Sequence, residues 1–234
     1  MSSLQKVHCK HFNLASVQVG SNSCIIGRKY SGKSQLAVDI IQSRPTPPRV
    51  VVFSSPFVYK SYHKFFQKGC VYDRYSPQVL EQLVKEQQET DQELVLLFDD
   101  VKTSNNQDFW NDKTLLDVWR YGSSLRITNI MLLQYVGQIT QIFQRNTDYV
   151  YLFRDNILAN QRLLFEYYWG MFSTFEDFKQ LYDSCMNTEP YRCIVINLTS
   201  THRDPMEYIH WYKSKKTLVQ IVQKKEISSN CSIM

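Results

Sequence analysis

Short apolar runs alternate along the chain with segments whose apolar residues recur at helical spacing. Several runs are apolar at successive positions, which is typical of strands buried on both faces of a parallel sheet. The alternation of strands and helices predicts an α/β fold with a mostly parallel central sheet flanked by helices. The predicted strands cover residues 24–26, 49–54, 93–100, 128–134, 148–153 and 193–198.

Segments whose apolar residues recur at helical spacing follow most of the predicted strands. Leu36, Ile40 and Ile41 share one face of a segment that starts at Lys33, and the prolines of 45–48 end it. The predicted helices cover residues 33–43, 77–88, 115–120, 157–170 and 174–186.

The length of 234 residues and the hydrophobic content of 43% suit one folded domain with a sizeable core. Neither an internal repeat nor an internal domain boundary is visible in the sequence. Lysines accumulate from Lys213 onward. We therefore expect one folded domain at 1–212 and a basic C-terminal tail at 213–234.

The net charge of +5 is mildly basic and is compatible with a polyanionic partner. The six cysteines form no C-x-x-C pair, which argues against zinc and favours reduced thiols in an intracellular compartment. The N-terminus lacks the apolar run of a signal peptide, and no segment has the roughly 18 apolar residues of a membrane span. The expected location is intracellular, and the protein is not expected to be secreted.

A phosphate-binding loop is predicted between the first strand and the first helix. The segment Gly27-Arg28-Lys29-Tyr30-Ser31-Gly32-Lys33-Ser34 fits the pattern G-x-x-x-x-G-K-[ST] in its usual strand–loop–helix context. Gly27 and Gly32 allow the tight turn that points backbone N–H groups at phosphate oxygens. Lys33 would reach the β- and γ-phosphates, and Ser34 would bind Mg²⁺. The predicted nucleotide contacts run from Gly27 through Gln35.

Asp99 and Asp100 end the apolar run 94–98 and are therefore expected at the carboxyl end of a buried strand. Ligands of open α/β sheets bind at this end of the strands. Asp99 is predicted to contact Mg²⁺ through the water shell of the ion. Asp100 is placed to orient or deprotonate the attacking water.

The nucleotide is predicted to be ATP, because the Asn-Lys-x-Asp element that GTPases use for guanine is absent. A Leu-Ser-Gly-Gly-Gln-like signature of transporter ATPases is absent as well. Gln134 closes the apolar run 130–133. If its strand lies between the strands carrying the loop and Asp99, Gln134 would reach the γ-phosphate and sense ATP against ADP.

These motifs occur in a recognisable order. The loop is followed by Leu96-Leu97-Phe98-Asp99-Asp100, by Arg120-Tyr121-Gly122, by Ile127 to Tyr135, and by Arg145 to Val150. The series, over about residues 20–212, resembles the DNA-packaging ATPases of nucleocytoplasmic large DNA viruses and their relatives. Those proteins are similar to the FtsK–HerA branch of P-loop motors, which have a RecA-like sheet.

The resemblance implies an ATPase that translocates double-stranded DNA into a preformed capsid, in the host cytoplasm at a virus factory and in the virion. It also implies a homo-oligomeric ring in which a neighbouring subunit supplies an arginine to each ATP site. Arg120 matches the family position best, although Tyr121 replaces the usual histidine. Arg145 lies one residue beyond a second family position, and Arg126 also remains open.

Other functions remain open from the sequence. A helicase-like motor or a small-molecule kinase would use the same loop. Cys231-Ser232-Ile233-Met234 matches a prenylation box with lysines upstream, so a membrane-anchored, nucleotide-dependent scaffold or contact with an inner-membrane component of a virus is an alternative. Lys102 and Lys113, in the loop after the aspartates, are candidates for DNA phosphate contacts.

Overall fold

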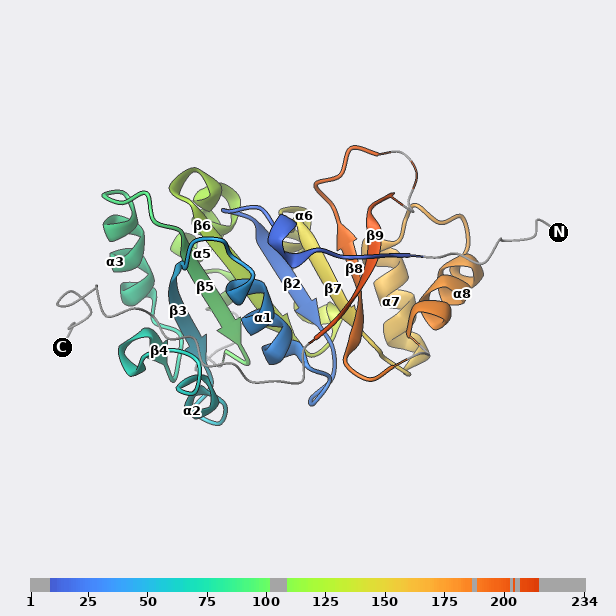
Figure 1. Cartoon of the computed structure of the whole chain (residues 1–234), viewed down its shortest axis with the longest axis horizontal. Helices are drawn as coiled ribbons and strands as arrows, with labels where there is room; N and C mark the ends of the chain where they lie inside the picture. Colours follow the sequence, from blue (N-terminus) through green and yellow to red (C-terminus); the bar gives the residue numbers. More distant parts are fainter. Residues whose placement is uncertain (1–8, 102–108, 187–188, 203, 205–206, 215–234) are drawn as a thin grey trace. The chain divides into compact units, whose positions relative to one another are not determined.

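The computed structural model describes residues 9–101, 109–186, 189–202, 204 and 207–214 (Figure 1). These residues form two compact units. The first contains residues 9–13, 23–33 and the described part of 133–214, and the second contains residues 14–22 and the described part of 34–132. Each unit combines strands with helices, and each is described by itself.

The first unit has its strands in the order β1-β9-β8-β7-β2. β2 is parallel to β7, and β1 is parallel to β9, whereas β8 is antiparallel to both of its neighbours. The strands are β1 (Lys10–His11), β2 (Asn22–Ile26), β7 (Tyr149–Phe153), β8 (Arg192–Asn197) and β9 (Ile209–Lys213). Its helices are η4 (Val136–Gln138), α6 (Gln141–Arg145), α7 (Leu158–Tyr168) and α8 (Phe175–Met186).

The second unit has its strands in the order β6-β5-β3-β4, with every neighbouring pair parallel. The strands are β3 (Arg49–Ser54), β4 (Val71–Tyr72), β5 (Leu94–Asp99) and β6 (Ile127–Leu133). Its helices are η1 (Leu14–Ser16), α1 (Lys33–Gln42), α2 (Tyr59–Tyr62), η2 (Lys68–Cys70), α3 (Pro77–Gln87), α5 (Lys113–Tyr121) and η3 (Gly122–Leu125).

The predicted α/β class with a mostly parallel sheet is confirmed, and each predicted strand and helix has a counterpart in the structure. The sequence did not reveal β1, β4, β9, α2 or α6. β1 and β4 have two residues each, which is too short for a period to be recognised. The partly polar sequence Ile-His-Trp-Tyr-Lys of β9 lacks the continuous apolar run of the other strands.

Register aligns the carboxyl ends of the strands in the second unit. Ser54 of β3 pairs with Asp99 of β5, and Asp99 pairs with Leu132 of β6. All six residues of β5 are buried, as are all seven of β6. The strands therefore form the core, while the last residues of β3 and β5, Ser54 and Asp99, bring polar groups to one edge.

Local signals explain where the helices of this unit begin. The Val79 N–H donates to Ser76 Oγ (3.3 Å) at the start of α3, and the Leu115 N–H donates to Asp112 Oδ1 (2.8 Å) at the start of α5. Such side-chain caps satisfy N–H groups that have no partner within the helix. Capping thus fixes the first residues of α3 and α5, the two helices that pack against each other beside the sheet.

A buried polar network lies at the opposite end of β5 and β6. Arg44 and Glu93 form an ion pair of 3.1 Å with side chains only 3% and 7% exposed. Glu93 also accepts from Thr128 Oγ1 (2.5 Å), which in turn accepts from the Gly20 N–H (2.8 Å). A buried charge is tolerated when it is paired and hydrogen-bonded in this way.

Among the described residues, the cysteines are thiols that form no disulfide with one another. Cys9 and Cys185 lie 3.2 Å apart between their sulfur atoms, and the hydrogen bond that they share lowers the pKa of the Cys185 thiol and raises the pKa of the Cys9 thiol. Within the part of the chain that the structure describes, the helices are too short or too polar to traverse a bilayer.

Candidate nucleotide-binding site

Two glycines shape the loop after β2, and both would resist a side chain. Gly32 has φ of +107°, a conformation that L residues rarely adopt. A Cβ on Gly27 would lie 2.6 Å from Phe153 Cβ, so the backbone passes too close to β7 for any side chain. The Gly27 N–H donates to the Leu133 carbonyl (3.0 Å), which anchors the loop at its first residue.

Lys33 folds back onto this loop. Its Nζ donates to the carbonyl oxygens of Gly27 (2.6 Å) and Arg28 (2.8 Å), and the residue is only 9% exposed. Lys33 is also the first residue of α1, where helix N–H groups have no partner within the helix. The ammonium group and the N-terminus of a ten-residue helix thus concentrate positive charge at one position.

The remaining loop residues are mostly open to solvent. Arg28, Lys29 and Tyr30 are exposed, with Tyr30 96% exposed and its φ at +64°. The buried Ser31 Oγ has no hydrogen-bond partner among the described residues. Gln35, predicted to contact nucleotide, donates instead to Asp39 Oδ1 (2.9 Å) along α1.

Asp99 and Ser34, the predicted magnesium pair, are in direct contact. Ser34 Oγ donates to Asp99 Oδ2 across 2.9 Å, and Asp99 is 8% exposed. The Tyr62 hydroxyl of α2 donates to the same oxygen across 2.6 Å. Burial, together with the Asp99 carboxylate, raises the pKa of Tyr62 well above its usual value, so the phenol stays protonated and remains a donor.

Tyr62 was not found from the sequence, because nothing in its surroundings marks it as more than a core aromatic. It lies on a four-residue helix 37 positions before Asp99. Only the three-dimensional arrangement brings its hydroxyl to the end of β5.

Asp100 turns away from the strand. Its φ of +51° places it in the left-handed region, which Asp tolerates better than most residues. Ser55, immediately after β3, donates from Oγ to Asp100 Oδ2 across 3.0 Å. The two consecutive aspartates thus have different partners, because Asp99 faces Ser34 and Tyr62 whereas Asp100 faces Ser55 and is half-buried.

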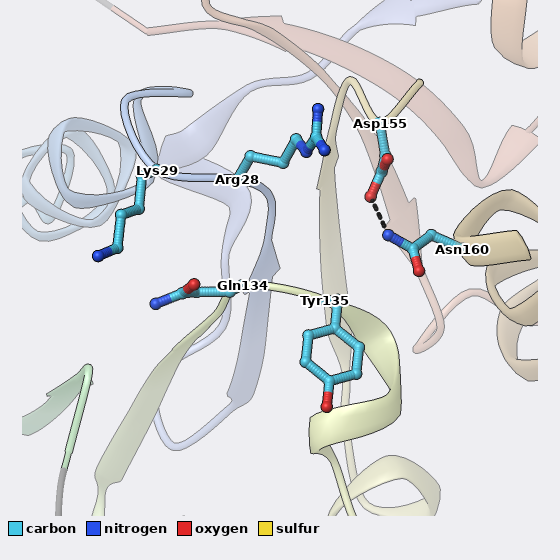
Figure 2. A pocket seen from close by; sticks show the side chains of 6 residues that line it. All are labelled: Arg28, Lys29, Gln134, Tyr135, Asp155 and Asn160. Atoms are coloured by element: carbon cyan, nitrogen blue, oxygen red, sulfur yellow. Dashed lines mark hydrogen bonds between the residues drawn. The ribbon is translucent and has the colours of Figure 1, made fainter. Parts of the chain in front are cut away.

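Gln134 directly follows Leu133, whose carbonyl bonds to Gly27, and this places it at the start of the phosphate loop. Its backbone N–H donates to Gln138 Oε1 (2.7 Å), which holds the chain as it leaves β6. In Figure 2 the Gln134 and Lys29 side chains extend to the same side of the view, while Arg28 extends toward Asp155. The pocket that they share, here called the polar pocket, has a volume of about 600 Å³ and is lined by Arg28, Lys29, Gln134, Tyr135, Asp155 and Asn160.

Asp155 is a further carboxylate that the sequence reading missed. It follows β7, is 5% exposed, and accepts from the Ile157 N–H (2.8 Å) and from Asn160 Nδ2 (2.7 Å; Figure 2). The signal that identified Asp99, an acidic residue just after a buried strand, is also present here. The signal was harder to recognise because Arg154 stands between the last residue of β7 and Asp155.

The three arginine candidates are exposed. Arg120 lies in the last turn of α5, Arg126 follows η3 with φ of +55°, and Arg145 ends α6. Of the predicted DNA contacts, Lys113 is exposed at the start of α5, whereas Lys102 lies outside the described residues. Cys231 and the basic tail after Ser214 also lie outside them.

The parallel strands, the glycine-rich loop running into α1 and the acidic end of β5 define a P-loop NTPase fold. Similar proteins agree with this class. The DNA-packaging ATPase B204 of Sulfolobus turreted icosahedral virus superposes with a TM-score of 0.61 at 15% identity, covering 85% of this chain and 100% of that one. B204 of Sulfolobus turreted icosahedral virus 2, in complex with ATPγS, gives 0.58 at 14% identity, covering 84% and 98%.

Relatives by sequence are viral proteins. Protein 088R of invertebrate iridescent virus 3 is 24% identical over 204 residues, which is 84% of this chain and 77% of the relative. Protein L437 of Acanthamoeba polyphaga mimivirus is 22% identical over 225 residues, 90% of this chain and 78% of the relative. No protein-family model matches. At these identities the likeness establishes the fold, and the resemblance to viral packaging ATPases is confirmed at that level.

Proposed function

We propose that this protein is an ATPase motor that translocates double-stranded viral DNA into a capsid. The observation that carries the proposal is the placement of two consecutive residues. Lys33 bonds to the carbonyls of the phosphate loop, and Ser34 bonds to Asp99 at the end of β5. The shared fold with viral packaging ATPases supports the same conclusion.

The loop has the features that a polyphosphate requires. A side chain at Gly27 is excluded by the close approach of Phe153, and one at Gly32 is disfavoured by the positive φ, so neither position places a Cβ between the loop backbone and a phosphate. The Lys33 ammonium would exchange its two carbonyl acceptors for phosphate oxygens. The N-terminus of α1 adds favourable electrostatics at the same position.

The Ser34–Asp99 pair fits Mg²⁺. A hydroxyl and a carboxylate oxygen 2.9 Å apart are close enough to serve one cation, and both are hard oxygen ligands of the kind this ion prefers. When bound, Mg²⁺ neutralises charge on the phosphates and on the departing group. Tyr62 would still donate to Asp99 if Ser34 turned to the metal.

Asp100 is the group that we assign to the attacking water. The Asp100 carboxylate accepts a hydrogen bond from Ser55, which holds its orientation. Because Asp100 is only half-buried, its carboxylate can also accept a hydrogen bond from a water molecule. Gln134 occupies the exit of β6 beside the loop and would contact the γ-phosphate. Loss of that phosphate on hydrolysis would release Gln134, which is a physical basis for distinguishing ATP from ADP.

A ring of identical subunits completes the proposal. Arg120, Arg126 and Arg145 are all exposed and hence available to a neighbouring subunit, where a guanidinium would stabilise charge on the γ-phosphoryl group. The net charge of +5 suits contacts with DNA phosphates, which carry no sequence information. For a protein that acts on newly made viral DNA, we expect a location in the host cytoplasm and a capsid component as a partner.

Variants of the loop and of the acidic pair test the enzyme directly. We expect Lys33→Ala to lose ATP binding and hydrolysis together, because the charge at the phosphates is removed. Asp100→Asn should keep ATP binding but lose at least about 100-fold in turnover, the scale of one general base. Fluorescent-nucleotide binding and phosphate release measure the two steps.

Asp91→Asn, an exposed carboxylate before β5, is the control for Asp100→Asn and should retain normal turnover. Normal turnover in Asp100→Asn would refute its role as the base. Unchanged hydrolysis in Lys33→Ala would contradict the nucleotide site itself.

A further inference from the structure

A second pocket, here called the aromatic pocket, adjoins the phosphate loop in the first unit and has a volume of about 560 Å³. It shares Arg28 and Lys29 with the polar pocket, and it extends along Tyr30 and Ser31 to the end of β7 and the turn before β8. A nucleotide whose phosphates occupy the loop must place its base and ribose within reach of the same residues. Both pockets meet that condition, and their chemistry distinguishes them.

The polar pocket is lined by Arg28, Lys29 and the Gln134 amide, which can donate to phosphate oxygens, and by the Asp155–Asn160 pair. By contrast, the aromatic pocket includes the rings of Phe153, Tyr30 and Tyr191. A purine base is a flat π-system that binds by stacking on such rings. The base therefore belongs in the aromatic pocket and the terminal phosphate in the polar one.

Tyr191 is the ring best placed to stack on a base. Its Cδ1 lies 3.1 Å from the position that a Cβ on Gly32 would occupy, so the ring borders the phosphate loop directly. Tyr191 is still 42% exposed. It also adopts φ of +63°, an uncommon conformation for an aromatic residue, and the Ser214 N–H holds its carbonyl (3.2 Å). The turn thus presents a partly open ring next to the loop.

Positive charge surrounds the same pocket. Arg28, Lys29, Arg154 and Arg192 contribute to its lining, and the single carboxylate there, Glu189, is ion-paired with Lys213. The Arg192 guanidinium lies 4.1 Å from the centre of the Trp211 ring, which keeps it at the edge of β8. Such a surplus of cations favours binding of an anionic nucleoside phosphate over an uncharged nucleoside.

We propose that the aromatic pocket binds the base and ribose of the nucleotide, with Tyr191 stacking on the base. The inference rests on the proposed function, since it assumes that the phosphates occupy the loop. Stacking is tolerant of the base because every base has a π-face. Tyr191 therefore contributes affinity to ATP and GTP alike.

Tripolyphosphate provides the test, because it carries the phosphates of ATP without the base. Tyr191→Ala should raise the Kd for ATP about tenfold or more, the scale of one lost base–aromatic stack, and leave the Kd for tripolyphosphate unchanged. Tyr191→Phe keeps the ring and should bind both ligands normally. Isothermal titration calorimetry with each ligand gives the constants.

Tyr208→Ala is the matched control, a tyrosine of the same unit that lies outside both pockets and should leave both constants unchanged. Equal weakening of ATP binding and tripolyphosphate binding by Tyr191→Ala would overturn the inference and indicate a structural role. Unchanged ATP affinity in that variant would also overturn the inference. A wild-type protein that binds neither ligand would instead refute the proposed function.

Discussion

Asp99 is a buried carboxylate that depends on two hydroxyl donors. Ser34 and Tyr62 both donate to its Oδ2. Hydrogen bonds to a charged group contribute more than neutral ones, and an unsatisfied buried charge is costly. Ser34 is the donor that the proposed metal would take over, and Tyr62 is a partner that would still hold Asp99 with the metal bound.

Tyr62→Phe removes this hydroxyl with little change in shape. We expect the folded state to lose about 1.5–3 kcal/mol of stability, the range for a hydrogen bond to a charged group. We also expect the Mg²⁺ concentration for half-maximal ATP hydrolysis to rise, because Asp99 is less firmly held. Urea unfolding and a magnesium titration of the ATPase rate measure the two effects.

Tyr59→Phe makes the same chemical change on the same helix and should alter neither quantity. If Tyr62→Phe matched this control in both assays, Tyr62 would have no role in holding Asp99.

At the scale of elements, parallel register gathers the site. Ser54, Asp99 and Leu132 are paired across three strands, so the residues that follow each strand emerge at the same edge. Ser55 and Asp100 meet there by a hydrogen bond. A polar residue directly after a buried parallel strand is therefore a sound sequence signal for a site at this edge.

The sequence was sufficient to predict the elements whose apolar residues follow a strong period. The loop, the end of β5 and the position of Gln134 follow from apolar runs with polar ends, and a buried strand has little freedom in where it stops. Tyr62 and Tyr191 could not be predicted, because each acts through a contact between residues distant in the chain. Tyr191 lies close to Gly32 because β8, which follows Tyr191, and β2, which precedes the loop, are both neighbours of β7 in the sheet.

Arginine candidates differ in the element that carries them, and mixed rings can separate them. If Arg120, on α5, serves the neighbouring site, mixing Arg120→Ala subunits with Lys33→Ala subunits should restore ATPase activity that neither variant shows alone. The physical reason is that an Arg120→Ala subunit keeps its own phosphate loop and can receive the arginine of a neighbouring Lys33→Ala subunit. ATPase rates across mixing ratios measure this effect.

Arg145→Ala, on α6, and Arg126→Ala are tested in the same way. Recovery of activity with one of these two variants, and none with Arg120→Ala, would reassign the finger. No recovery with any of the three would argue against a shared site formed by any of them.

At the scale of the whole molecule, the proposal depends on assembly. A phosphate loop, a metal pair, a water-orienting carboxylate and a γ-phosphate contact are all assigned within one chain, and only the arginine is assigned to a neighbour. The viral ATPases with the same fold act in DNA packaging, as their names state. DNA and a second subunit are thus the components whose effect on ATP hydrolysis decides between a motor and a small-molecule kinase.

The most direct measurement is the ATPase rate of the purified protein against its own concentration, at low salt, with and without duplex DNA. We predict that turnover per subunit rises steeply with concentration and rises further with duplex DNA of any sequence. The Lys33→Ala protein gives the background rate. Turnover that is independent of both concentration and DNA would contradict the packaging motor.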